Sequence, residues 1–173
     1  MALTQALPAV EGSALAGLFD WVLALRQLVP GGYYDFLLKH SRVWEARHCL
    51  EAWANGVPRE CFRNAGLLAL SNPELTYVEG VAVAHVIPTA HAWCVTPEGI
   101  VVDPTWANPE EAAYIGIPFK TAFLKRRLAD TEVWGIIGEH IPPAVHAANP
   151  SSFLAERWAA SVGLQATDKP RPA

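Results

Sequence analysis

The chain of 173 residues lacks several features that would place it in a common functional class. It has no basic excess, because 13 Lys and Arg stand against 17 Asp and Glu for a formal net charge of −4, which argues against a nucleic-acid-binding surface. The basic cluster at residues 125–127 (KRR) is typical of an exposed helix face or helix end. Without a long uncharged apolar run or a positively charged N-terminal stretch, we expect neither a membrane span nor a signal peptide.

Paired cysteine motifs are also missing. Cys49, Cys61 and Cys94 show no CxxC or other metal-ligand spacing, and an odd number of cysteines does not indicate a disulfide framework. We therefore expect reduced thiols, a cytoplasmic protein, and no metal or other cofactor. Zinc bound by Cys61, His91 and Asp103 is a weaker alternative, since all three are ligand types but no pairing motif links them.

The residues that are present favour one globular domain. Hydrophobic residues make up 51% of the chain, which is enough for a sizeable core at this length. We assign residues 1–162 to a single domain. Residues 163–173 are polar and contain proline, so we expect a disordered tail.

Apolar periodicity and Pro/Gly breaks predict an order of mixed elements. The expected helices lie between Ser13 and Pro30 and at about 33–54, 61–70, 121–128 and 150–161, the last with Asn149 as its N-cap. The expected strands lie at 76–87, 91–96, 100–103 and 133–137. Residues 104–120, rich in Pro, Ala and aromatics, are expected to form an ordered loop.

Three residues in this order suit nucleophilic catalysis. Cys61 falls in the first turn of a predicted helix, where the partial positive charge of the helix N-terminus favours thiolate. His91 and Asp103 lie on the two arms of a predicted hairpin around the turn at residues 97–99 (PEG). A carboxylate beside an imidazole orients the ring and stabilises its protonated form, which leaves the other ring nitrogen for a thiol.

The register of the predicted hairpin decides whether the two side chains meet. If Trp93 faces Val101, then His91 faces Asp103 directly and on the same face of the hairpin. A slip of one residue would place them on opposite faces. In the same pattern Cys94 points to the face opposite His91, so we expect it in the core.

Four segments together carry a resemblance to a known family. Residues 61–65 (CFRNA), 77–81 (YVEGV), 91–93 (HAW) and 103–106 (DPTW) resemble, in order and spacing, the transglutaminase-like branch of the papain-like cysteine enzymes. The resemblance covers roughly residues 58 to 106. The short chain and its extra N-terminal helices are more similar to small bacterial or phage-associated members than to the large calcium-dependent animal transglutaminases.

The resemblance implies a fold and a set of roles. The fold would be α+β, with N-terminal helices and the Cys-bearing helix packed on an antiparallel sheet. Cys61 would be the nucleophile, His91 the base and Asp103 the residue that orients it. Besides transglutaminases, members of the family include peptidases, amidases, deamidases and proteins that have lost the triad, so the fold does not choose the reaction.

The expected activity is thiol-dependent hydrolysis of an amide or peptide bond through a thioester. Acyl transfer to an amine and non-enzymatic peptide binding are the alternatives. A peptide, a protein side chain or a small amide is the expected partner, with no nucleic acid and no membrane.

Other site residues are weaker predictions. Asn55 is a candidate side-chain donor to an oxyanion, although a helix C-cap beside Gly56 is the more common role for such an Asn. Trp53 is the alternative donor by analogy with transglutaminases. Aromatic residues are candidates for lining a substrate groove, and core packing is their alternative role. These candidates are Trp93, Trp106, Tyr114 and Phe119.

Overall fold

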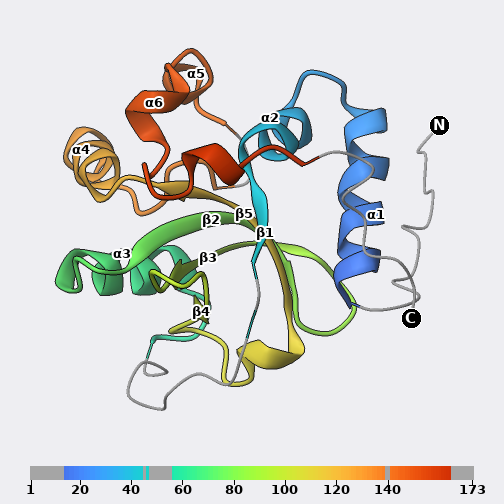
Figure 1. Cartoon of the computed structure of the whole chain (residues 1–173), viewed down its shortest axis with the longest axis horizontal. Coiled ribbons are helices and arrows are strands. Elements are labelled where there is room, and N and C mark those ends of the chain that lie inside the picture. The colour runs from blue at the N-terminus through green and yellow to red at the C-terminus, as the bar shows by residue number, and fades with distance from the viewer. Residues whose placement is uncertain (1–13, 45, 47–55, 139–140, 165–173) are drawn as a thin grey trace.

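The computed structural model describes residues 14–44, 46, 56–138 and 141–164, and it has a mixed helix-and-sheet fold, as the sequence predicts (Figure 1). The helices are α1 (Ala14–Leu28), α2 (Tyr33–His40), α3 (Cys61–Ser71), α4 (Thr121–Thr131), α5 (Pro143–His146) and α6 (Pro150–Phe153), with short 3-10 turns η2 (Pro109–Glu111) and η3 (Ala159–Ser161). The strands are β1 (Arg42–Trp44), β2 (Thr76–Val83), β3 (Thr89–Val95), β4 (Val101–Val102) and β5 (Ala113–Phe119).

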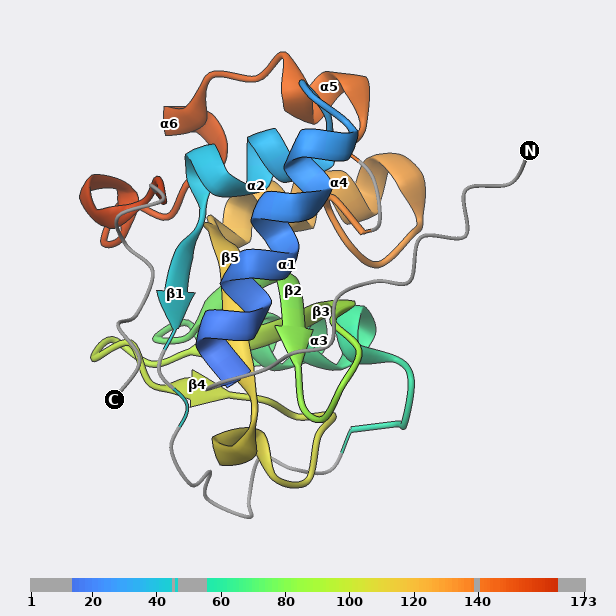
Figure 2. The ribbon, with the colours of Figure 1, turned by 90° about the vertical axis from the view of Figure 1, so that its right-hand side faces the viewer.

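The strands form one sheet in the order β1-β5-β2-β3-β4, and every neighbouring pair is antiparallel. The helices share a large core with one face of this sheet. In Figure 2, α1 crosses in front of β5 and β2. This core includes Phe19 of α1, Leu37 of α2, Ala65 of α3 and Leu124 of α4. The sheet contributes to this core through every second side chain of its strands, because successive side chains point to opposite faces.

The opposite face carries a smaller aromatic cluster. Trp44, Trp93, Tyr114 and Trp158 pack there with short aliphatic side chains. Gly116 makes room for this packing, because a Cβ at that position would lie 2.5 Å from the Trp93 ring. His91 lies two residues before Trp93 on β3, so its side chain points to the same face. Asp103 directly follows β4 and belongs to this face as well, because Val101 pairs with Val95.

The largest difference from the sequence prediction is β5. Residues 113–119 were expected within a loop, but they form a strand with β1 on one side and β2 on the other. Pro118 is tolerated because β1 reaches only as far as Gly116. The Pro118 carbonyl instead accepts a hydrogen bond from Ala155 N at 3.0 Å.

The predicted helix at 33–54 is wrong at residues 41–44, and its residues 45 and 47–54 lie outside the described residues. α2 ends at His40, and Ser41 turns into the extended conformation. Residues 42–44 then pair with β5 as an edge strand. Tertiary pairing therefore overrides the helical apolar spacing of this segment.

The predicted strand at 76–87 is four residues too long. β2 ends at Val83, because its partner β3 begins at Thr89, which pairs with Ala82. The chain reverses between them, and His85, Val86 and Ile87 lie exposed in the connecting loop.

The C-terminal third is less regular than predicted. Residues 133–137 form bends where a strand was expected, and the predicted helix at 150–161 is divided into α6 and η3. Asn149 does cap α6, since its Oδ1 accepts from Ser151 N at 3.0 Å. Gly163 N donates to Ser41 O, which ties the first residue of the predicted tail to the domain. The described helices include none that is long and apolar enough to cross a membrane.

Candidate active site

Cys61 is the first residue of α3 and is 9% exposed. The chain enters α3 through a turn in which Arg59 adopts a left-handed conformation with φ of +68°. One turn further along, Ala65 packs into the core against β3, and its carbonyl accepts a hydrogen bond from the Cys94 thiol at 3.3 Å. The start of the helix thus holds Cys61 where the first-turn N–H groups have no intrahelical acceptors.

His91 and Asp103 form a buried ion pair. The His91 Nε2 lies 2.6 Å from Asp103 Oδ2, and the two side chains are 3% and 0% exposed. β4 pairs only with Cys94 and Val95, so the outer edge of β3 is not covered by β4 at His91. The chain leaves the sheet after β4 and turns the Asp103 carboxylate toward the ring.

The predicted neighbourhood of these two side chains is confirmed, although the register is wrong by two residues. Val101 pairs with Val95, where Trp93 was expected. The turn closes with Gly99 N donating to Thr96 O, and Gly99 has a φ of +87°. A shift of two preserves the face of every side chain, so the imidazole and the carboxylate still meet.

The Asp103 carboxylate is saturated by donors. Its Oδ2 accepts from His91 and from the Tyr114 hydroxyl at 3.0 Å. Its Oδ1 accepts from the backbone N–H groups of Thr105 at 2.8 Å and Trp106 at 3.1 Å. Donors on both oxygens fix the plane of the carboxylate relative to the imidazole.

The Cys61 side chain lies beside the His91 ring, close enough to raise the pKa of the imidazole. Because Asp103 occupies Nε2, Nδ1 is the ring nitrogen that remains for a thiol. Burial acts to lower the pKa of His91, but the hydrogen bonds with Asp103 and Cys61 and the charges of both raise it to about 9. The geometry therefore favours a protonated imidazole between a carboxylate and a sulfur at neutral pH.

Asn64 links the Cys61 helix to the loop that follows Asp103. Its Nδ2 donates to Val57 O at 2.7 Å and to Thr105 Oγ1 at 3.0 Å, and its Oδ1 accepts from Val57 N at 3.1 Å. Gly56 N donates to Pro104 O at 2.7 Å, and a Cβ on Gly56 would lie 2.3 Å from that oxygen. These contacts fix the distance between the thiol and the other two candidate catalytic residues.

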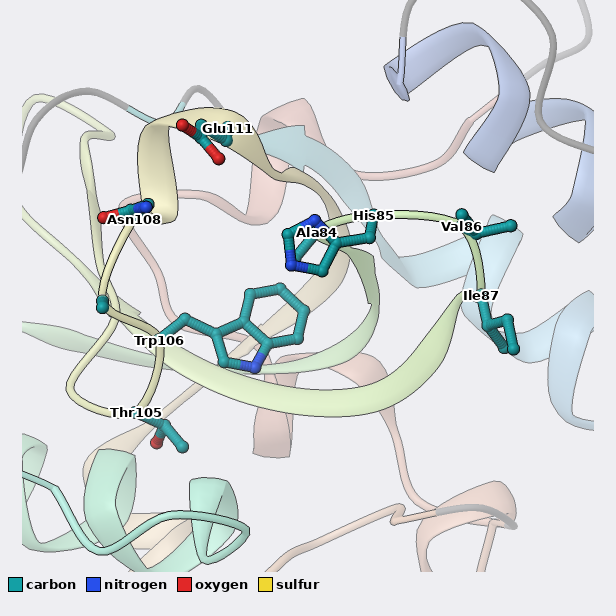
Figure 3. A pocket seen from close by; sticks show the side chains of 9 residues that line it. Ala84, His85, Val86, Ile87, Thr105, Trp106, Asn108 and Glu111 are labelled. Carbon is teal, nitrogen blue, oxygen red and sulfur yellow. The ribbon is translucent and has the colours of Figure 1, made fainter.

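Trp106 joins the ion pair to a pocket. Its ring stacks on the His91 ring with centroids 4.0 Å apart and planes 14° apart. The pocket has a volume of about 530 Å³ and lies between the β2–β3 loop and the segment that leads to η2 (Figure 3). Its lining residues are Ala84, His85, Val86, Ile87, Thr105, Trp106, Ala107, Asn108 and Glu111.

The other aromatic candidates do not line this pocket. Trp93, Tyr114 and Phe119 are all 0% exposed. Phe119 faces the main core near Phe123 and Phe153, since the β5 register places it on the helix-covered face. Tyr114 contacts Asp103, and Trp93 packs behind His91, with ring centroids 6.2 Å apart.

Two further predictions have different outcomes. Cys94 lies in the core as expected, and its burial raises the pKa of the thiol. Asn55 and Trp53, the candidate oxyanion donors, lie outside the described residues. Within the described part of the chain, no three His, Cys, Asp or Glu side chains are arranged to hold a metal ion.

Glu79 is a second buried carboxylate, and the sequence did not predict its role. It is 0% exposed and accepts from Tyr77 Oη at 2.8 Å, from Ile137 N at 2.9 Å, from Gly138 N at 3.1 Å and from Ile136 N. Burial raises the pKa of Glu79 against the opposing effect of these hydrogen bonds. The available signal was a charged residue within an otherwise apolar strand.

No family model, curated protein or solved structure matches the chain. The candidate function therefore depends on the geometry of these side chains and on the sequence pattern.

Proposed function

We propose that the protein is a thiol-dependent hydrolase that cleaves an amide or peptide bond through Cys61, His91 and Asp103. The observation that carries the proposal is the buried ion pair of Asp103 and His91, with Cys61 beside the His91 ring at a helix N-terminus. This arrangement supplies a nucleophile, a proton carrier and an orienting group within hydrogen-bonding reach of one another.

The chemistry takes two steps. The Cys61 sulfur attacks the carbonyl carbon, a C–S bond forms, and the carbonyl oxygen becomes an oxyanion near the Cys61 N–H. The C–N bond then breaks, and the amine leaves with the proton that His91 carries. Water, deprotonated by His91, attacks the thioester and releases the acid and the free thiol.

The similarity of residues 61–106 to the transglutaminase-like pattern supports the same roles, and we extend the proposal to a papain-like arrangement of the core. Asn55 or Trp53 would supply the second oxyanion donor. A reducing, cytoplasmic setting suits the mechanism, because Cys61 and Cys94 are both free thiols.

Alkylation by iodoacetamide at pH 6, mapped by mass spectrometry, tests the chemical basis. We expect Cys61 to react at least about tenfold faster than an ordinary thiol, because it lies beside the His91 imidazole at a helix N-terminus. Cys94 is the internal control, since it is 0% exposed and reacts only when the protein unfolds. His91→Ala should remove the rate advantage. If Cys61 reacts at the same rate in both proteins while Cys94 stays protected, the proposal is wrong.

The fate of the acyl group is tested separately. Peptide and glutamine amides are incubated with and without a primary amine, and the products are separated by mass. Release of the free acid in excess over the amine adduct is the expected result. An adduct that exceeds the acid would replace hydrolysis with acyl transfer, whereas peptide binding without turnover would favour the non-enzymatic alternative.

A further inference from the structure

The pocket beside Trp106 has two walls of different chemistry. The β2–β3 loop supplies an aliphatic wall, in which Val86 is 66% exposed and Ile87 is 75% exposed. The opposite wall carries the Asn108 amide and the Glu111 carboxylate at the rim (Figure 3). The nine described lining residues include no Lys or Arg; Glu111 is the acidic side chain among them, and the His85 imidazole lies between it and Trp106 (Figure 3).

The pocket adjoins the proposed catalytic residues through Trp106 and Thr105. One face of the Trp106 ring covers His91, so the pocket contacts the opposite face and the ring edge. Thr105 lines the pocket and also accepts a hydrogen bond from Asn64, three residues after Cys61. A substrate whose carbonyl reaches Cys61 would place a neighbouring side chain in this pocket, and the inference depends on that placement.

We propose that this pocket binds a basic side chain, preferably arginine, of the peptide substrate. The aliphatic stem of arginine would lie against Val86 and Ile87, its planar guanidinium would stack on Trp106, and its charge would pair with Glu111. An aliphatic side chain would satisfy only the loop wall, and an acidic one would oppose Glu111. This inference rests on the proposed function, because it assumes that Cys61 attacks a peptide carbonyl.

Peptidyl acyloxymethyl ketones provide the test, since the thiolate forms a C–S bond to the probe and displaces its carboxylate. Matched probes carry arginine, lysine, norleucine or the neutral isostere citrulline at the residue next to the electrophile, or at the residue before it. Rates of Cys61 modification at pH 7.5 are measured by intact mass. We expect arginine to react roughly threefold to fivefold faster than citrulline at one of these positions, the size expected of an ion pair that solvent still reaches.

The variants assign the preference to Glu111. Glu111→Gln should bring the arginine-to-citrulline ratio close to one, and Glu111→Lys should invert it. Glu110→Gln is the matched control, because Glu110 lies on the same 3-10 turn but does not line the pocket, and it should keep the wild-type ratio. No arginine preference at either position, or a preference that survives Glu111→Gln, would overturn the pocket assignment.

Failure of the two proposals can be told apart. If Cys61 keeps its His91-dependent reaction with iodoacetamide but shows no side-chain preference, only the pocket assignment is wrong. If neither iodoacetamide nor any probe reacts faster with the wild-type protein than with His91→Ala, the proposed function fails and the inference fails with it.

Discussion

Two buried carboxylates, Asp103 and Glu79, lie on opposite faces of the same sheet and have very similar surroundings. Each is 0% exposed and accepts a hydrogen bond from a tyrosine, Tyr114 for Asp103 and Tyr77 for Glu79. Each also accepts backbone N–H groups of a nearby loop. They differ in one partner, because Asp103 also contacts the imidazole of His91.

That single partner separates a candidate catalytic role from a structural one. The donors of Glu79 are neutral and hold residues 136–138 against the sheet, so its hydrogen bonds stabilise the position of a loop. The hydrogen bonds of Asp103 hold a carboxylate that pairs with the His91 ring and raises the pKa of the imidazole. Burial and hydrogen bonding alone therefore do not distinguish the two carboxylates, and the imidazole beside Asp103 does.

The largest expected effects come from neutralising each carboxylate in turn. Asp103→Asn leaves the buried imidazolium without its counter charge, so we expect the free energy of unfolding at pH 7 to fall by about 3 to 5 kcal/mol. The alkylation rate of Cys61 should fall toward that of His91→Ala. Glu79→Gln should cost about 1 to 3 kcal/mol, because one amide donor loses its acceptor, and it should leave the alkylation rate of folded protein unchanged.

The two variants, Asp103→Asn and Glu79→Gln, are compared by denaturant unfolding and by the rate of Cys61 alkylation, both measured on the same samples. Equal losses of Cys61 reactivity in the two variants would show that the rate follows general stability and would remove the distinction between the carboxylates.

The sequence predicted the parts of the site that depend on local pattern. The helix that begins at Cys61 follows from apolar period and the break at Pro58, and α3 begins at that residue. The contact between His91 and Asp103 survives the error in register because the shift is two residues and the face is preserved.

Long-range pairing is what the sequence did not predict. β5 contains Gly116 and Pro118, which are typical of loops, and it becomes a strand only because β1 and β2 flank it. Tyr114 reaches Asp103 only because β5 is a strand. From the sequence alone, this role could not be distinguished from that of a residue lining a substrate groove. The acceptor role of Glu79 likewise depends on residues 57 to 59 positions further along the chain.

Stability should also depend on pH in a way that involves both faces. The pKa of His91 is raised from 6.5 to about 9, so its ion pair contributes fully below about pH 6.5 and is lost as the pH rises through 9. The loss is on the order of 3 kcal/mol. The pKa of Glu79 is also raised above 4.5, so the contribution of Glu79 to the free energy of unfolding likewise decreases with rising pH. That decrease begins at a lower pH, near 4.5.

Urea unfolding of wild type and His91→Gln between pH 5 and pH 10 measures the His91 contribution. The difference in unfolding free energy between the two proteins should shrink mainly between pH 7 and pH 10. A difference that stays constant across this range would mean that His91 does not gain a proton on folding, and the charged pair with Asp103 would have to be abandoned.

The smallest effects come from the two tyrosines, and they give the sharpest comparison because the changes are chemically identical. Tyr114→Phe and Tyr77→Phe each remove one buried hydroxyl donor to a carboxylate, and each should cost about 1 kcal/mol of unfolding free energy.

The two variants should differ in their effect on His91. With one donor fewer, the Asp103 carboxylate interacts more strongly with the ring, so Tyr114→Phe should raise the pKa of His91 by about a few tenths of a unit. Tyr77→Phe should leave it unchanged, because its hydroxyl lies on the other face. NMR titration of ¹³C-labelled histidine between pH 7 and pH 10 measures both shifts. If both variants move the His91 titration equally, the two carboxylates are coupled through the sheet, and the separation of a catalytic face from a structural one is lost.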